Sequence, residues 1–365
     1  DLWDAETRGC IRTTSGEIKL RACVTSESPY IIVEAEATEG ERDFTWRFYP
    51  ESTDSPRQLN AILKKSKNHF KKDYISNPAS QLYERNGLNY CWQPLLAGGG
   101  TATVWKEIRK GNKSVLVISN THSFPETDAL KKAETALANL QTADISLLRQ
   151  AHRDWWHNYY PQSFISLPDK KIENFYWAQM YKLASATRVG GGLLDNSGPW
   201  QVLTPWPNTW WNLNVQLSYW PVYASNRLEL GMPVVDAINN NFENLINNVP
   251  EAYRKDAAAL PVATDFNLVG VDVRVPGSKP FAQVGNLPWL CHNLWLQYRY
   301  SMDESILRNT VYPTLRRAIN FYLPFLEEDG QGILHLKETY SPEYGNAKDC
   351  NYDLALLRWG CLTLL

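Results

Sequence analysis

The stretch from Pro199 to Pro221 concentrates aromatic rings and side-chain amides in one place. It holds five of the fifteen Trp residues of the chain, interleaved with Asn208, Asn212, Asn214 and Gln216. A Trp side chain offers a flat apolar face and an N–H donor, and the amides are uncharged donors and acceptors. A sugar ring is apolar on one face and hydroxylated around its rim, so the segment predicts a carbohydrate site. The alternative is a buried helix packed with aromatic residues.

The elements that must position this segment change character along the chain. Short stretches rich in β-branched and aromatic residues predict strands at 17–24, 30–38, 43–50, 101–109 and 113–121. Strands of this length and spacing are typical of an antiparallel sandwich. We therefore expect an N-terminal β-sandwich domain over residues 1–122.

Helical periodicity begins near Ser123. Residues 123–160 predict a helical linker whose apolar face runs from Leu130 to Leu140. Further helices are predicted over residues 172–188, 213–227, 231–249, 288–301, 304–329 and 352–365. Within the segment 304–329, Pro313 either kinks the helix or starts a new one. The connection 257–279 lacks helical period, and long loops on a helical scaffold are where sites are usually built.

Composition excludes several classes of function. The 37 basic and 39 acidic residues are interspersed and give a net charge of −2, which predicts no partner among nucleic acids or anionic membranes. The basic segment Lys64–Lys72 is interpreted as a solvated loop or helix face. No apolar run reaches the 18 or more residues that span a bilayer. The N-terminal residues DLWDAETRGC lack the pattern of a signal peptide, which is also expected where one has been removed.

The cysteines and glycines give no sign of a cofactor. Six cysteines are widely spread, without a CxxC pair and without a His at ligand spacing, so we expect scattered buried thiols rather than disulfides. Gly98–Gly100 is not followed by the GK[ST] of a phosphate-binding loop. We expect no metal site and no cofactor.

Several segments in a consistent order resemble a known family. ISLLRQAHRDWWHNYYPQSFISLP followed by IENFYWAQMYKLASATR is similar to the linker and first barrel helix of glycoside hydrolase family 95, the inverting α-L-fucosidases and α-L-galactosidases. WWNLNVQLSYWP looks like the Asn-x-Asn segment of that family, ETYSPEYG like its Ser-Pro-Glu loop, and NYDLALLRWG like the helix that follows. The resemblance runs from about Asp144 onward. It implies an (α/α)6-barrel catalytic domain over residues 161–365.

Carried over position by position, the resemblance implies that Glu343 is the general acid and that Asn212 and Asn214 hold the attacking water. Inverting hydrolysis protonates the leaving oxygen on one side while water attacks the anomeric carbon from the other. A carboxylic acid supplies that proton if burial keeps its pKa high. An amide oxygen can orient water but needs a carboxylate nearby to polarise it, and we expect no counterpart of the family's downstream Asp in this chain. The alternative for both Asn residues is backbone capping.

Two departures from the family pattern concern the sugar and the acid. Trp210 stands where the fucosidases usually have a His that helps to hold the sugar, and Tyr344 follows the acid where Asn is common.

Twelve barrel helices need on the order of 300 residues with their loops. Only 205 residues follow Tyr160, so we expect a partial toroid.

The carboxylates have competing interpretations. Glu343 lies in a Gly-flanked loop with no helix to cap, and its alternative is a loop carboxylate facing water. Glu338 is the rival acid, in a segment that alternates like a short strand. Asp353 is predicted to cap the last helix, with substitution for the polarising carboxylate as the alternative. Asp265 and Asp272 are expected in surface turns.

The aromatic candidates for substrate binding also have alternatives. Trp210 and Trp211 are adjacent, so at most one is expected to stack on the sugar. Trp206 is a further platform, with core packing as its alternative. Tyr344 lies beside the acid. His292 is a substrate-binding candidate whose alternative is a hydrogen-bonded, semi-buried side chain.

These interpretations predict an exo-acting, inverting glycosidase that releases a terminal α-linked sugar of the L-fucose or L-galactose type from an oligosaccharide or polysaccharide. The alternatives are an inactive relative that binds glycan and another (α/α)6 glycosidase or phosphorylase. A phosphorylase needs a basic phosphate pocket, for which the sequence gives no signal. The resemblance also implies a secreted or periplasmic location.

Overall fold

The computed structural model of the protein describes residues 1–51, 53–65, 71–138, 140–141, 144–200, 202–271, 273–278 and 280–365. The chain divides into two compact units. The sheet unit comprises Asp1–Gln58 and Lys71–Phe164, and the helical unit comprises Leu59–Phe70 and Ile165–Leu365. Each unit is described by itself. The three-domain division at residues 122 and 160 stays a prediction.

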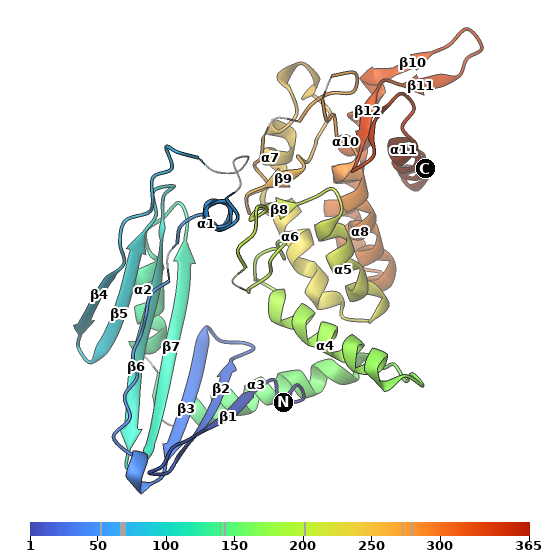
Figure 1. Ribbon diagram of the computed structural model, residues 1–365. Helices are drawn as coiled ribbons and strands as arrows, with labels where there is room; N and C mark the ends of the chain where they lie inside the picture. The colour runs from blue at the N-terminus through green and yellow to red at the C-terminus, as the bar shows by residue number, and fades with distance from the viewer. Residues whose placement is uncertain are drawn as a thin grey trace. The chain divides into compact units, whose positions relative to one another are not determined.

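The sheet unit is built on a seven-stranded antiparallel sheet (Figure 1). The strands in spatial order are β1 (Thr7–Arg12), β2 (Glu17–Val24), β3 (Tyr30–Ala37), β7 (Lys113–Ser123), β6 (Gly100–Lys110), β5 (Leu88–Pro94) and β4 (Gln81–Arg85). Four of the five strands predicted from the sequence are confirmed. The edge strands β1 and β4 were not predicted, and both are exposed along their whole length, so they lack the apolar alternation that marks a half-buried strand.

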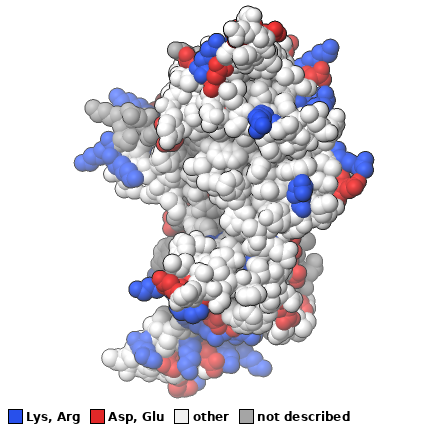
Figure 2. Space-filling model, turned by 90° about the vertical axis from the view of Figure 1, so that its right-hand side faces the viewer, with Lys and Arg blue, Asp and Glu red and all other residues white. Residues whose placement is uncertain are grey.

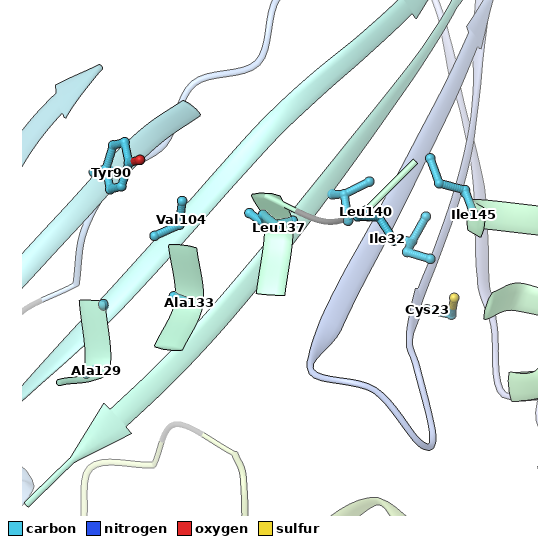
Figure 3. Close-up of a cluster of buried hydrophobic side chains, with 11 residues drawn as sticks. Cys23, Ile32, Tyr90, Val104, Ala129, Ala133, Leu137, Leu140 and Ile145 are labelled. Atoms are coloured by element: carbon cyan, nitrogen blue, oxygen red, sulfur yellow. The ribbon is translucent and has the colours of Figure 1, made fainter. Parts of the chain in front are cut away.

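One face of the sheet packs against helix α2 (Ala129–Ala138). Ala129, Ala133 and Leu137 repeat at helical spacing and are fully buried against strand residues that include Val104 and Ile32 (Figure 3). Successive strand side chains point to opposite faces, which is why alternate residues of β6 enter this core. Ala133, Leu137 and Leu140 of the predicted apolar face are buried against the sheet, and Leu130 is partly buried. That this helical segment links two domains stays a prediction.

The opposite face carries a segment that was wrongly predicted to be a strand. Residues 43–50 are without regular structure, although Phe44 and Trp46 pack against the sheet. The Trp46 indole donates a hydrogen bond to the Ser114 hydroxyl (2.9 Å), so this segment is held by side chains rather than by a backbone ladder. The antiparallel sheet is confirmed, but the described part of the unit contains one sheet rather than the two of a sandwich.

Helix α3 (Asp144–Tyr159) ties the N-terminal residues into the sheet unit. The side chain of Glu6 is fully buried and accepts hydrogen bonds from the guanidinium groups of Arg21 and Arg153. A buried carboxylate is tolerated when it is paired in this way, because the ion pair and its hydrogen bonds offset the lost hydration. A salt bridge therefore joins the N-terminus, β2 and α3.

The helical unit contains eight α-helices and several short elements among its described residues. Its helices are α4 (Lys170–Ala186), α5 (Asn214–Ala224), α6 (Met232–Asn240), α7 (Phe242–Asn247), α8 (Asn286–Ser301), α9 (Glu304–Ile306), α10 (Tyr312–Asn320) and α11 (Asn351–Leu364). Its short strands are β8 (Thr209–Trp210), β9 (Ala263–Thr264), β10 (Leu326–Glu328), β11 (Leu334–Leu336), β12 (Thr339–Ser341) and β13 (Gly345–Ala347), and α1 (Pro56–Leu63) begins in the sheet unit and ends in this one.

Two predicted helices are each interrupted. The helix expected over 231–249 breaks between α6 and α7 at Asn241, where φ is −124°. The helix expected over 304–329 contains a π-helical turn, Leu307–Val311, and ends well before 329. Pro313 lies in the first turn of α10, which follows the π-helical turn without a break. The expectation of a partial toroid stays a prediction.

Helix α8 is the centre of this unit and contacts α5, α10 and α11. Its buried side chains include Leu290, Cys291 and Leu294. Helix α11 approaches α10 closely at Gly360, because a Cβ there would lie 2.3 Å from the Ile319 side chain. The broad upper surface in Figure 2 is mostly uncharged and carries scattered side chains of both signs, Lys and Arg as well as Asp and Glu.

Candidate active site

A pocket with a volume of about 500 Å³ lies within the helical unit. Segments far apart in the sequence line it, and the lining residues are Asn196, Trp206, Trp210, Asn212, Leu213, Asn214, Trp289, Ser341, Pro342, Glu343, Tyr344 and Tyr352. Six residues that the sequence singled out therefore line a single pocket. We call Trp210–Asn214 the amide wall and Ser341–Tyr344 the acid loop.

The amide wall is anchored by Trp211. Its side chain is 0% exposed, its indole donates to the Thr264 hydroxyl (2.8 Å), and its backbone N–H donates to the Val262 carbonyl (2.9 Å). The Gln216 side chain, also fully buried, donates to the Trp211 carbonyl. The prediction of Trp211 as a substrate-binding residue is wrong, because its ring lies in the core and has no face open to a ligand.

Trp210 and Trp206 face the pocket instead. Trp210 is half-buried in β8 and pairs with Ala263 of β9, so strand alternation sends its ring to the side opposite Trp211. Trp206 is 50% exposed and packs edge-on against Trp210 with ring centroids 6.4 Å apart. The rings of Trp206 and Trp210 both line the pocket and are accessible to a ligand. The sequence predicted that at most one of the adjacent rings, Trp210 or Trp211, would stack on a sugar.

The amide groups of Asn212 and Asn214 hydrogen-bond to other side chains. The Asn214 amide donates to Oδ1 of Asn196 (2.8 Å), and the Asn212 amide donates to Oε1 of Gln283 (3.4 Å). With the N–H groups engaged in this way, each Asn keeps its carbonyl oxygen as an acceptor. Both side chains line the pocket, so these acceptors are available to a water or a hydroxyl.

The acid loop is the tip of the β12–β13 hairpin. The Tyr344 backbone N–H donates to the Ser341 carbonyl (3.1 Å), which closes the turn. Glu343 has a φ of 66°, a left-handed conformation that costs a residue with a Cβ roughly 1–2 kcal/mol. Such strain is most often kept at functional positions. Glu343 lines the pocket yet is exposed, and Tyr344 beside it is 94% exposed.

The exposure of Glu343 differs from the buried acid that the chemistry led us to expect. The reason is geometric, because the hairpin strands are three residues long and Glu343 is at their tip. The separation of roughly 6–10 Å expected between its carboxyl and the Asn amides stays a prediction.

The rival carboxylates lie away from the pocket lining. Glu338 is half-buried between β11 and β12, and its carbonyl accepts a hydrogen bond from Gly277 (2.7 Å). Asp353 is fully buried, and burial raises its pKa to about 6. Its oxygens bind Tyr322 and Thr339, whereas the N-cap of α11 is Cys350, so the prediction that Asp353 caps this helix is wrong.

The remaining sequence candidates are also outside the pocket lining. His292 is half-buried in α8 between the rings of Trp220 and Trp359, 6.4 and 5.2 Å away, and burial lowers its pKa. His292 is not among the residues that line the pocket, and its role in substrate binding stays a prediction. Asp265 accepts hydrogen bonds from Asn267 and Val269 in a turn, as expected. Asp272 and residues 66–70 of the basic segment lie outside the described residues.

No cofactor site is evident in the part of the chain that the structure describes. It contains no group of three or more His, Cys, Asp or Glu side chains that could hold a metal ion. All six cysteines are free thiols, of which Cys10 and Cys361 are exposed and the other four are buried. Among the described helices, none is both long enough and apolar enough to cross a membrane.

The sequence did not single out Trp289, Tyr352, Asn196 or Ser341. Trp289 is half-buried in the first turn of α8, and Tyr352 meets it edge-on with ring centroids 5.8 Å apart. The Tyr352 ring also lies against Gly285, where a Cβ would come within 2.4 Å of it. Trp289 and Tyr352 each lie near the start of a helix that follows a non-helical segment. That position is the one sequence feature that could have indicated them as pocket residues.

Comparisons with known proteins identify the family of the helical unit. Residues 165–358 match the model of the glycosyl hydrolase family 95 catalytic domain. Alpha-L-fucosidase 2 of Arabidopsis thaliana is 25% identical over 176 residues, which are 47% of this chain and 21% of that protein. A probable alpha-fucosidase A of Aspergillus niger is 26% identical over 188 residues, 48% of this chain and 23% of that protein. The chain thus spans about a fifth of the length of these relatives.

A solved structure supports the fold. The chain superposes over its whole length on 51% of a putative kojibiose phosphorylase from the human microbiome, with a TM-score of 0.67 and 11% sequence identity. The family model covers residues 165–358, which is more than half of the chain and includes every residue of the pocket. The protein therefore belongs to glycoside hydrolase family 95.

Proposed function

We propose that this pocket belongs to an inverting, exo-acting glycosidase that releases a terminal α-linked L-fucose or L-galactose from a glycan. The observation that carries the proposal is the presence of Glu343, Asn212 and Asn214 in the lining of one pocket. A carboxyl group and a pair of amide oxygens are the two functions that protonation and water attack require.

In this mechanism Glu343 protonates the glycosidic oxygen as the bond to the sugar breaks. The Asn212 and Asn214 carbonyl oxygens accept hydrogen bonds from a water and hold it on the opposite side of the anomeric carbon. Their N–H groups are already engaged with Gln283 and Asn196, which supports this orientation of the amides. Closure of the site around the substrate would bury Glu343, which the acid needs in order to keep its proton.

The lining also fits a neutral sugar. The aromatic rings Trp206, Trp210, Trp289 and Tyr352 supply apolar faces, and Glu343 is the one charged residue among the described lining residues. The names of the two curated relatives support L-fucose as the sugar. Trp210 in place of the His of the fucosidases favours testing L-galactosides as well.

The decisive experiment compares variants of the full-length protein on two substrates. Glu343→Gln keeps the shape of the side chain but removes the transferable proton, so hydrolysis of a natural glycan should slow by roughly 10²–10⁴-fold. The loss should shrink on an aryl glycoside, whose phenolate leaves without protonation. Asn212→Ala and Asn214→Ala should slow both substrates alike, because both reactions need the water. Equal slowing of the two substrates by Glu343→Gln would disprove its role as the acid.

A second candidate function is glycan binding without hydrolysis. The specific observation in its favour is that, among the described lining residues, no second carboxylate lies beside Asn212 and Asn214 to polarise the water. If the wild type cleaves neither α-L-fucosides nor α-L-galactosides but binds the glycans, this function replaces the first.

The domain division and the location belong to the same proposal. We propose three parts, residues 1–122, 123–160 and 161–365, and a secreted or periplasmic protein. Limited proteolysis tests the boundaries, because cleavage should concentrate in the exposed residues that follow β7, 125–127, and in those that follow Tyr160. Fractionation of the source cells tests the location.

A further inference from the structure

A buried polar cluster lies directly behind the acid loop. The Thr339 hydroxyl donates to Oδ2 of Asp353 (2.6 Å), and the Tyr322 hydroxyl donates to Oδ1 of the same carboxylate (2.7 Å). All three side chains are 0% exposed. Hydrogen bonds of this length to a buried carboxylate are strong and directional, because no water competes for the partners.

The three members of the cluster come from different elements. Thr339 is the first residue of β12, the strand that runs into the acid loop, and Glu343 follows four residues later. Asp353 lies in the first turn of α11, directly after Tyr352, which lines the pocket. Tyr322 lies beyond the end of α10 and is remote in sequence from the acid loop. Asp353 thus joins the strand that carries the acid to the helix that supplies another pocket residue.

Other contacts also hold the base of this hairpin. The Tyr340 ring packs edge-on against Phe281, with ring centroids 4.8 Å apart. β12 pairs only with the three-residue strand β13 in the described sheet, and the Tyr340 backbone N–H donates to the Ala282 carbonyl (3.0 Å). Glu343 and Tyr344, at the tip, are exposed. The side-chain hydrogen bond from Thr339 to Asp353 is one of the contacts that hold the base of the hairpin, and it ties β12 to the buried carboxylate of α11.

We infer that Asp353 is a positioning residue, which fixes the acid loop through Thr339 so that the Glu343 carboxyl meets the glycosidic oxygen. This inference rests on the proposed function, because it assumes that Glu343 is the acid. Asp353 acts from behind the pocket and contacts neither the substrate nor the water. A displacement of about 1 Å in a reacting group can slow a reaction by roughly 100-fold.

The test uses a matched pair of variants that each remove one hydrogen bond to Asp353. Thr339→Val cuts the bond to the strand of the acid loop, and Tyr322→Phe cuts the bond to the other element. Each leaves an isosteric side chain at a fully buried position. Both variants are compared with wild type on a natural glycan and on an aryl glycoside, with kcat and KM measured separately and the melting temperature recorded.

Thr339→Val should lower kcat on the glycan by roughly 10–100-fold with KM nearly unchanged, and lower it much less on the aryl glycoside. Tyr322→Phe should lower the melting temperature to a similar extent, yet change kcat on both substrates by only a few fold. Thr339→Ser, which restores the hydroxyl, should recover most of the activity. A purely structural role would reduce both substrates in proportion to lost stability.

The inference is overturned if Thr339→Val keeps full activity on the glycan, or if it and Tyr322→Phe slow the two substrates alike. Should Thr339→Val fail to fold, Asp353→Ala decides the matter, because it removes both acceptor oxygens and must show the same dependence on the leaving group. Glu343→Gln, measured on the same substrates, distinguishes failure of the proposed role of Glu343 as the acid from failure of the positioning role of Asp353. If Glu343→Gln shows the dependence and the Thr339 and Asp353 variants do not, only the positioning role is wrong.

Discussion

The two sides of the pocket are built in opposite ways. The amide wall continues directly from the core, since Trp211 within it and Gln216 just after it are fully buried. The acid loop is the tip of a short hairpin. The last two residues of this loop, Glu343 and Tyr344, are exposed. The amides that we propose hold the water are therefore placed by packing, whereas Glu343, the proposed acid, is placed by a few hydrogen bonds behind it.

This difference matches what each side must do in the proposed reaction. Water has to be held at a fixed point, and a rigid site pays little entropy to hold it. The acid has to reach an oxygen that belongs both to the sugar and to a variable leaving group. Glu343 is exposed at the tip of a hairpin with three-residue strands, so a shift of this residue disturbs no core packing.

The largest expected effect separates two adjacent residues of the amide wall. Trp211→Ala removes a fully buried indole and its hydrogen bond to Thr264, so the free energy of unfolding should fall by about 3–5 kcal/mol. Chemical denaturation monitored by circular dichroism measures this loss. Trp210→Ala, one residue away and half-buried, should lower the unfolding free energy far less while weakening sugar binding.

If Trp210→Ala and Trp211→Ala lower the free energy of unfolding equally, the amide wall does not divide into a core side and a ligand side. Loss of sugar binding in a folded Trp211→Ala protein would contradict its assignment to the core.

A smaller effect should appear in the pH dependence of stability, and only behind the acid loop. Burial raises the pKa of Asp353 from its ordinary 3.8 to about 6, whereas residues 210–214 contain no titratable side chain. A raised carboxyl pKa means that the folded state holds a proton that the unfolded state has released. The stabilisation is therefore complete below about pH 4 and is lost as the pH rises to about 6.

The measurement is the difference in unfolding free energy between wild type and Asp353→Asn at several pH values. Wild type should lose stability relative to the variant between about pH 4 and 6, and the difference should then stay constant. Other titrating groups, His335 among them, are present in both proteins, so their contributions cancel in the difference of unfolding free energies. A difference that does not change across this window would show that Asp353 titrates like an exposed carboxyl.

Much of the site could be predicted because its residue types have few other uses. Trp and Asn at close spacing indicated a carbohydrate site at the amide wall, whereas Glu343 was named through the resemblance of ETYSPEYG to the Ser-Pro-Glu loop of glycoside hydrolase family 95. The sequence could not decide between Trp210 and Trp211, because a two-residue strand fixes which ring faces the pocket. It also could not place Trp289 or Tyr352, since their contribution depends on how α8 and α11 pack.

The fold shows the same limit. Alternation and helical period predicted most inner strands and helices, because these elements bury one face. They misjudged residues 43–50, where aromatic residues pack on the sheet without entering its ladder, and Asp353, whose partners Tyr322 and Thr339 are brought to it only by tertiary structure. Side-chain hydrogen bonds between distant segments leave no local pattern.

The smallest expected effect compares the exposed aromatic rings at the two sides of the pocket. Tyr344, next to the acid, should contact the leaving group, because the acid acts on the oxygen that joins it to the sugar. Trp206, next to the amide wall, should contact the terminal sugar itself. An aromatic contact contributes about 0.5–1.5 kcal/mol, so Tyr344→Ala should raise KM for an extended glycan by roughly 2–10-fold. It should leave inhibition by the free sugar unchanged, whereas Trp206→Ala should weaken that inhibition by a similar factor. If both variants weaken inhibition by the free sugar equally, the two sides of the pocket do not divide the substrate between them.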